Sequence, residues 1–320
     1  MLRKSVPALL FCCAAALAQA QQITGLGGLL KSQQGGDTFT WQMDYLRTLG
    51  DYAAFSAGWL NEGHAPGHHR DGPLAQIWWR TTSFDQRLTL AAGVGPYAYF
   101  DTVPTTTGDG SHDNHGIGVI ASAAASWRVD GPWSLQLRFN HVQTRHSADS
   151  NAVLLGVTYR LEGAATPSDS PAIRSGSDSE VDLLLGRTIV NTLASEDSFA
   201  AQLEYRRRLG PYWAWSVGLL NEGDARTQRR SGVTAEFWAG HEFLDRRVTA
   251  AIGIGPYLVA GIRRNPQLVE ASRERLAGIL SLTFAYAPVP QWAIRWTWHR
   301  IFAERSHDSD VLVLGAGYRF

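Results

Sequence analysis

Hydrophobic and polar residues alternate along most of this chain, in stretches of roughly ten residues. Between Phe39 and Tyr45, every second residue is aromatic or methionine, and the residues between them are Thr, Gln and Asp. A period of two is typical of a β-strand whose two faces meet different surroundings, so the pattern predicts eight strands in each half of the chain. They lie near residues 22–30, 38–48, 52–62, 73–82, 87–100, 115–128, 133–142 and 151–161, and near 180–189, 198–208, 212–222, 233–243, 247–260, 273–286, 291–301 and 310–320.

The bulky faces of these strands indicate what surrounds them. From residue 292 to 298 every second residue is Trp or Ile, whereas the opposite face carries Arg295, Thr297 and His299. Such a surface promotes aggregation in water but is expected where a strand faces lipid. About ten residues is also the length at which a tilted strand crosses a bilayer. The pattern therefore predicts an all-β fold, a transmembrane antiparallel β-barrel.

The connections between the predicted strands differ in length. Short turns are expected at 49–51, 84–86, 130–132, 209–211, 244–246 and 289–290, and longer polar loops at 63–72, 101–114, 143–150, 223–232 and 261–272. Short turns on one side of the membrane and longer loops on the other are usual in outer-membrane barrels. An even number of strands places both chain ends on the side of the short turns, which is expected to be the periplasm.

The sequence also consists of two similar halves. Residues 37–97 align without a gap with residues 197–257, and the ending 156–161 matches 315–320. A period this long indicates a duplicated domain and not a solenoid repeat. The expected organisation is a signal peptide at 1–20, a first eight-stranded barrel repeat at 21–162, a linker at 163–179 and a second repeat at 180–320.

Sixteen strands could close as one wide barrel or as two narrow ones. The Ser-, Pro- and Asp-rich stretch 162–180 is longer than a usual periplasmic turn. The inward faces are mostly small residues, with a few large groups such as Trp78, Trp238, Arg138 and Arg295 that could plug a narrow lumen. These features favour two tandem eight-stranded barrels, and one 16-stranded barrel is the alternative.

The N-terminus has the pattern of a secretory signal peptide. Arg3 and Lys4 precede a short apolar stretch, which ends in a small-x-small cleavage site at 18–20 and is too short to span a membrane. Both cysteines, Cys12 and Cys13, lie inside this segment, so we expect an exported protein without disulfides. Loss of the signal peptide leaves the mature chain with a slightly negative net charge, which gives no reason to expect a nucleic-acid partner.

The other end of the chain carries a second signal. Tyr318 and the terminal Phe320 are aromatic residues two positions apart. This ending resembles the C-terminal signature of bacterial outer-membrane β-barrels, whose final strand ends in Phe and is read by the barrel assembly machinery. The resemblance implies that Tyr318 and Phe320 are an assembly signal. It also implies a location in the cell outer membrane of a Gram-negative envelope, with outer-membrane lipid, lipopolysaccharide and the assembly machinery as partners.

The loop after the third predicted strand is rich in groups that bind ions. Three histidines and two carboxylates between residues 61 and 72 could hold a divalent metal. The second copy of this loop has Asp, Gln and Arg where those histidines stand, so we predict a rim ion pair and neither a metal nor a cofactor. The residues common to both copies are the candidates for this rim: Asn61, Glu62, Arg70, Asn221, Glu222 and Arg230.

Each half also resembles the plan of the outer-membrane lipid A deacylases, eight-stranded barrels with a His/Ser/Glu triad. His141 matches the histidine, but Gln143 stands at the serine position, and the second half has Arg300 and Phe302 at these two positions. The resemblance therefore covers the barrel and not the active site, and we predict no catalytic residues. The expected role is structural or auxiliary in the envelope, for surface polymer or lipid handling. The alternatives are a 16-stranded porin-like channel for small polar solutes and a lipid A deacylase-like hydrolase.

Overall fold

The computed structural model describes residues 21–33, 35–65, 67–83, 86–104, 111–161, 178–192, 196–225, 228–243, 247–262, 275–303 and 307–320. The predicted signal peptide and residues 163–177 of the predicted linker lie outside these ranges. Ser179, which the sequence analysis assigned to the linker, is the first residue of a strand. Within the described ranges, no helix combines the length and the apolar character needed to cross a bilayer.

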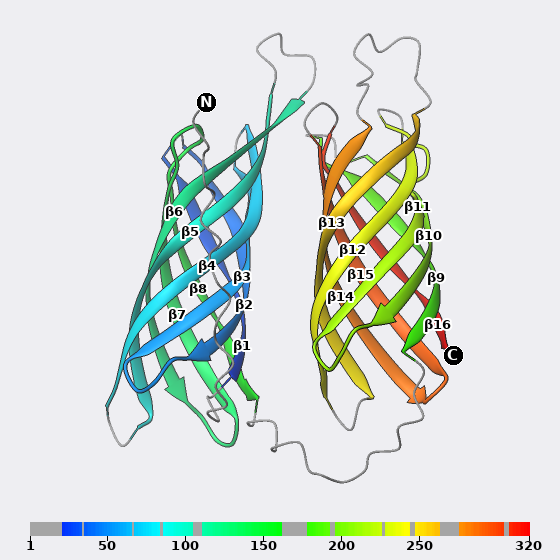
Figure 1. Ribbon diagram of the computed structural model, residues 1–320. Helices are drawn as coiled ribbons and strands as arrows, with labels where there is room; N and C mark the ends of the chain where they lie inside the picture. The colour runs from blue at the N-terminus through cyan, green and yellow to red at the C-terminus, as the bar shows by residue number, and fades with distance from the viewer. Residues whose placement is uncertain are drawn as a thin grey trace, which may run out of the picture. The chain divides into compact units, whose positions relative to one another are not determined.

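Sixteen antiparallel strands make up the described chain (Figure 1). The first eight are β1 (Gln21–Ser32), β2 (Asp37–Thr48), β3 (Ala53–Ala65), β4 (His68–Ser83), β5 (Leu88–Pro104), β6 (Ser111–Arg128), β7 (Trp133–Gln143) and β8 (Ser150–Leu161). The second eight are β9 (Ser179–Val190), β10 (Asp197–Arg208), β11 (Trp213–Asn221), β12 (Arg230–Phe243), β13 (Val248–Ile262), β14 (Leu276–Val289), β15 (Trp292–Phe302) and β16 (Ser309–Arg319).

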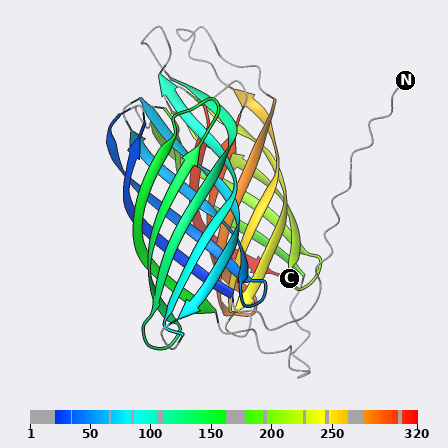
Figure 2. The same cartoon turned by 90° about the vertical axis from the view of Figure 1, so that its left-hand side faces the viewer.

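Each set of eight strands closes on itself. In the first barrel β1 pairs with β2 and also with β8, where Gln21 lies opposite Leu161. In the second barrel β9 pairs with β10 and with β16, where Glu180 lies opposite Arg319. Both closed walls can be followed in Figures 1 and 2. The expectation of two eight-stranded barrels is confirmed, and the 16-stranded alternative is wrong. A bilayer offers no hydrogen-bond partners to an open strand edge, and each set of eight strands already pairs its own first and last edges.

The outer faces of the barrel walls are apolar, whereas the lumens hold buried polar and charged side chains beside apolar clusters. Trp79 exposes 74% of its surface, whereas its neighbour Trp78 points into the lumen and exposes 2%. Phe39, Met43 and Tyr45 lie on the exposed face of β2, as the alternation predicts. This is the reverse of a water-soluble protein, and it confirms the predicted assignment of faces.

The barrels also share an aromatic feature at one end. We call the end that carries the β2–β3 connection and its counterpart β10–β11 the turn end, and the opposite end the loop end. At the turn end Trp133 and Tyr159 pack edge to face at 4.7 Å between ring centroids, and Trp292 and Tyr318 do the same at 5.1 Å. Paired Trp and Tyr rings at one level are typical of the boundary between lipid and water.

At the loop end of the first barrel, the strands are longer than predicted. β3 continues to Ala65 and β4 begins at His68, so most of the expected loop 63–72 is a strand hairpin. β5 likewise reaches Pro104 and β6 begins at Ser111. The predicted loop 63–72 is therefore mostly strand, and strands extend into both ends of the predicted loop 101–114, because a two-stranded ladder bonds through the backbone and continues through polar residues.

Candidate functional site

A tryptophan lies across the lumen of each barrel. Trp78 of β4 donates its indole hydrogen bond to Ser56 Oγ at 2.8 Å, and Trp238 of β12 donates to Ser216 Oγ at 2.8 Å. A Cβ added at Gly93 would come within 2.6 Å of the Trp78 ring. The repeated glycine therefore provides the space that the indole fills, which explains why Gly and Trp recur together in both copies.

An arginine covers each of these indoles, but it comes from a different strand in each barrel. In the first barrel Arg138 of β7 lies 5.0 Å from the ring centroid and bonds to Asp44. In the second barrel Arg206 of β10 lies 3.9 Å from the ring and bonds to Glu204 at 2.7 Å. Asp44 and Glu204 occupy matching positions, so the acceptor is fixed while the donor changes. Each arrangement combines a buried ion pair with a cation–π contact.

Beside this ion pair, polar side chains in the first lumen form a connected chain of hydrogen bonds. Gln76 donates to Ser122 Oγ at 2.9 Å, and Ser122 donates to Asn140 Oδ1 at 2.7 Å. Asn140 donates to Gln42 Oε1 at 2.7 Å, and Gln42 donates to Asp44 Oδ1 at 2.9 Å. All five residues are buried. Because these side chains bond directly to one another, they form one hydrogen-bonded network inside the lumen.

The second lumen is filled by a different chain at the same depth. His299 is fully buried and bonds through Nε2 to Gln202 Oε1 at 2.8 Å and through Nδ1 to Ser281 Oγ at 2.6 Å. Gln202 in turn donates to Glu204 Oε2 at 3.2 Å. The two lumens therefore contain more charged groups than the sequence analysis expected from their many small residues. Parity assigned these residues to the inside but gave no information about their partners.

At the loop end, the candidate rim residues of the second barrel form a compact cluster. Arg230 makes two parallel bonds to Glu222, from Nε to Oε1 and from Nη2 to Oε2, each 2.8 Å long. Ser309 of β16 donates to Glu222 Oε2 at 2.6 Å and accepts a bond from Arg230 Nη2 at 2.6 Å. All three side chains are buried. This two-pronged geometry is the strongest form of an arginine–carboxylate contact.

The first barrel repeats part of this cluster. Glu62 and Arg70 are buried, and Ser150 of β8 donates a hydrogen bond to Glu62 Oε1. Strand parity predicts that both glutamates point inward, but it gives no connection to the serines of the last strand. The available signal was the recurrence of Ser150 as Ser309 on the inward parity of both final strands.

The two candidate asparagines shape the turn beside this rim. Asn61 Oδ1 accepts a bond from the Gly63 amide at 2.9 Å, and Asn221 Oδ1 accepts one from the Gly223 amide at 2.9 Å. Both glycines have positive φ, 67° and 83°, which an L-residue with a side chain rarely adopts. Asn and Gly therefore direct the chain here, whereas Glu222, Arg230 and Ser309 present charged and hydroxyl groups to the lumen of the second barrel.

The remaining candidates have ordinary structural surroundings. His141 Nδ1 lies 3.0 Å from the amide oxygen of Asn151, which is not the carboxylate that a catalytic triad requires. His68 Nδ1 lies 2.9 Å from Asp101. Among the residues that the structure describes, no three His, Cys, Asp or Glu side chains form a group suited to a metal ion. Phe320 is exposed, and its amide donates to the Ser179 carbonyl at 3.0 Å, beside the seam that closes the second barrel.

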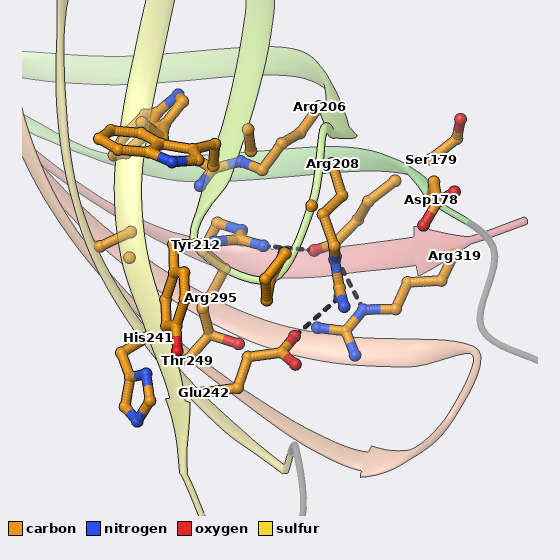
Figure 3. A pocket seen from close by; sticks show the side chains of 18 residues that line it. Asp178, Ser179, Arg206, Arg208, Tyr212, His241, Glu242, Thr249, Arg295 and Arg319 are labelled. Atoms are coloured by element: carbon orange, nitrogen blue, oxygen red, sulfur yellow. Dashed lines mark hydrogen bonds and ion pairs between the residues drawn. The ribbon is translucent and has the colours of Figure 1, made fainter. Parts of the chain in front are cut away.

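The turn-end mouth of the second barrel is a pocket of about 600 Å³, counting the space open to solvent (Figure 3). Its charges are paired. Arg295 bonds to Glu180 at 2.6 Å and to Asp182 at 3.0 Å, and Arg319 bonds to Glu180 at 2.8 Å. Figure 3 also shows Arg208 reaching the Glu242 carboxylate, at 2.8 Å. Each arginine in these contacts has a carboxylate partner, so the mouth is close to electrically balanced.

A closed antiparallel wall with an apolar exterior and a filled polar interior defines a transmembrane β-barrel protein, here with two barrels in one chain. No protein-family model and no curated protein matches the chain.

Three solved structures illustrate what the fold is similar to. Neisserial surface protein A matches 46% of this chain and 100% of its own at 16% identity, with a TM-score of 0.36. The attachment invasion locus protein Ail of Yersinia pestis matches 45% of this chain and 97% of its own at 8% identity, with a TM-score of 0.33. The toluene transporter TodX of P. putida matches 95% of this chain and 91% of its own at 11% identity, with a TM-score of 0.25.

Proposed function

We propose that this chain is an outer-membrane protein whose two barrels are non-conducting membrane anchors, with a structural or auxiliary role in handling envelope lipid or surface polymer. The observation that carries the proposal is the filling of both lumens. An eight-stranded barrel has an interior just wide enough for its own side chains. Here a tryptophan, an arginine and a buried carboxylate occupy that interior in each barrel.

The energetics of these plugs oppose passage of a solute. To pass the first lumen, a solute would have to separate Arg138 from Asp44 and displace Trp78, all of which are buried. Removing one partner from a buried ion pair costs about 3–5 kcal/mol, and the hydrogen-bonded chain beside it would also be disrupted. The surfaces left for function are therefore the two ends of each barrel and the lipid-facing walls.

Three features support the outer membrane as the location. The exterior is apolar, the turn end carries paired Trp and Tyr rings, and the chain has the predicted signal peptide and terminal Phe320. Membrane fractionation tests this part of the proposal: the protein should sediment with outer-membrane markers and resist extraction at high pH. Recovery in the soluble periplasmic fraction would contradict it.

The test of the non-conducting role is single-channel recording of the refolded chain in a planar bilayer. We expect a silent bilayer, with folding verified by heat-shifted gel mobility. A variant in which Trp78→Ala and Arg138→Ser open the first lumen is the control, since it should produce small openings if it folds. Large, stable openings by the unmodified chain would show that the lumens conduct and would overturn the proposal.

A further inference from the structure

The turn-end mouth of the first barrel has the same location as the pocket in Figure 3 but a different charge. It opens into a pocket of about 630 Å³, counting the space open to solvent. None of the described residues that line it is Asp or Glu. Its lining includes five arginines: Arg80, Arg87, Arg128, Arg138 and Arg160.

Most of this positive charge is not neutralised by the residues that the structure describes. Arg138 bonds to Asp44, but the other four arginines make no ion pair with any residue that the structure describes. The Nε atoms of Arg80 and Arg160 are buried and have no hydrogen-bond acceptor within the described ranges. Arg80, Arg128 and Arg160 are also close enough to repel one another. A buried Nε–H donor without an acceptor is costly, and an anion at this mouth would also reduce the repulsion among the arginines.

The second barrel shows how the same mouth is neutralised from within. In the seam of the first barrel, Gln22 lies opposite Arg160, and in the seam of the second barrel Glu180 lies opposite Arg319. Glu180 accepts a bond from Arg319 at 2.8 Å and another from Arg295. The first barrel thus has an amide where the second has a carboxylate. Its arginines are the ones left for a ligand.

We propose that the turn-end mouth of the first barrel binds a phosphate-bearing anion, held by Arg80, Arg128 and Arg160. A guanidinium is planar and donates two parallel hydrogen bonds, a geometry that matches phosphate oxygens. A phosphate group offers several oxygens to several arginines at once and carries enough charge to offset their repulsion. The source is either the headgroup of an anionic membrane phospholipid or a soluble phosphate compound, since both present the same group.

The experiment uses the chain without its predicted signal peptide, refolded into phosphatidylcholine nanodiscs and titrated calorimetrically with inorganic pyrophosphate. The test variant is Arg80→Gln/Arg160→Gln. The matched control is Arg319→Gln, which removes the counterpart of Arg160 from the balanced mouth. We expect the test variant to bind about tenfold more weakly or worse, because it loses charged hydrogen bonds. The control should bind as the unmodified chain does.

A second arm distinguishes the two sources. Nanodiscs that include phosphatidylglycerol should weaken pyrophosphate binding by the unmodified chain if the headgroup occupies the mouth, and should leave the affinity unchanged if the ligand is soluble. Heat-shifted mobility checks folding. The single variant Arg80→Lys keeps the charge and removes only the planar fork, and we expect it to bind at an intermediate level. The proposal is overturned if neither arm shows phosphate binding, if the double variant binds as well as the unmodified chain, or if Arg319→Gln loses as much affinity.

Discussion

At the scale of single residues, Arg230 makes several contacts at the rim of the second barrel. It is buried, it makes a two-pronged bond to Glu222, and it shares Ser309 with that carboxylate. Removing one partner from a buried ion pair leaves an uncompensated charge. We therefore expect Arg230→Met to lower the free energy of unfolding by about 3 kcal/mol, and Glu222→Gln/Arg230→Met to recover part of that loss.

Urea unfolding in detergent micelles, followed by tryptophan fluorescence, measures this effect. Arg229→Met is the control, because Arg229 pairs with Asp224 on the exposed surface at 3.4 Å and should change stability by less than about 1 kcal/mol. If both variants shift the unfolding midpoint equally, the rim pair does not stabilise the barrel.

The lumen glycine gives a second test at this scale. A methyl group at Gly93 would come within 2.6 Å of the Trp78 ring, which is itself bonded to Ser56. We expect Gly93→Ala to destabilise the first barrel by about 1–3 kcal/mol through overpacking. Gly25→Ala on β1 is the matched control, since nothing lies within 4 Å of a Cβ there. Equal unfolding midpoints for the two variants would mean that the indole moves aside without cost.

At the scale of strands, the two barrels cover the lumen tryptophan with an arginine from different strands. The arginine that covers the lumen tryptophan comes from β7 in the first barrel and from β10 in the second. The position of Arg206 on β10 is occupied by Leu46 in the first barrel. We expect Arg138→Thr to destabilise the first barrel by about 3 kcal/mol, because it leaves Asp44 buried and unpaired. Adding Leu46→Arg should restore most of that loss by supplying the arginine from β2, as the second barrel does from β10.

The comparison of Arg138→Thr with Leu46→Arg/Arg138→Thr by urea unfolding decides this point. Leu46→Arg alone is the control and should not stabilise the barrel, because Asp44 already has a partner. A double variant no more stable than Arg138→Thr would show that the two arrangements are not interchangeable.

The strands were predictable from the sequence to different degrees. A period of two fixes which side chains point inward, so the lumen positions of Asp44, Trp78 and Arg138 followed from parity alone. The strand ends did not, because backbone pairing continues through the polar residues at 63–72 after the apolar signal has stopped. The contact between Glu62 and Ser150 was also missed, since two inward positions far apart in sequence meet only when the barrel closes.

At the scale of the whole molecule, the predicted role of the C-terminus in assembly can be tested. Phe320 lies next to the seam of the second barrel and bonds through its amide to Ser179. We expect deletion of Phe320 to reduce the amount of folded protein in the outer membrane severalfold, as the resemblance of this ending to an assembly signal implies. Leu161→Ala, at the matching end of the first barrel, should have a much smaller effect.

The measurement is the fraction of heat-modifiable protein in the outer-membrane fraction of expressing cells. Full accumulation of the shortened chain would show that Phe320 is not needed for assembly.

The number of barrels cannot be predicted from the pattern of strands, because the same sixteen strands can close as one barrel or as two. It was decided by hydrogen bonds between β1 and β8, which no local sequence feature specifies.

That pairing has a consequence for how the first barrel can be rebuilt. Gln21 and Leu161 lie opposite each other in an ordinary antiparallel pair. β1 and β8 are therefore arranged like the two strands of a hairpin, but no turn connects them. A short loop joining the two residues, with new ends cut at the turn between β6 and β7, would give a circular permutant with every strand contact unchanged. The order in which the strands are synthesised could then be varied separately from the structure that they form.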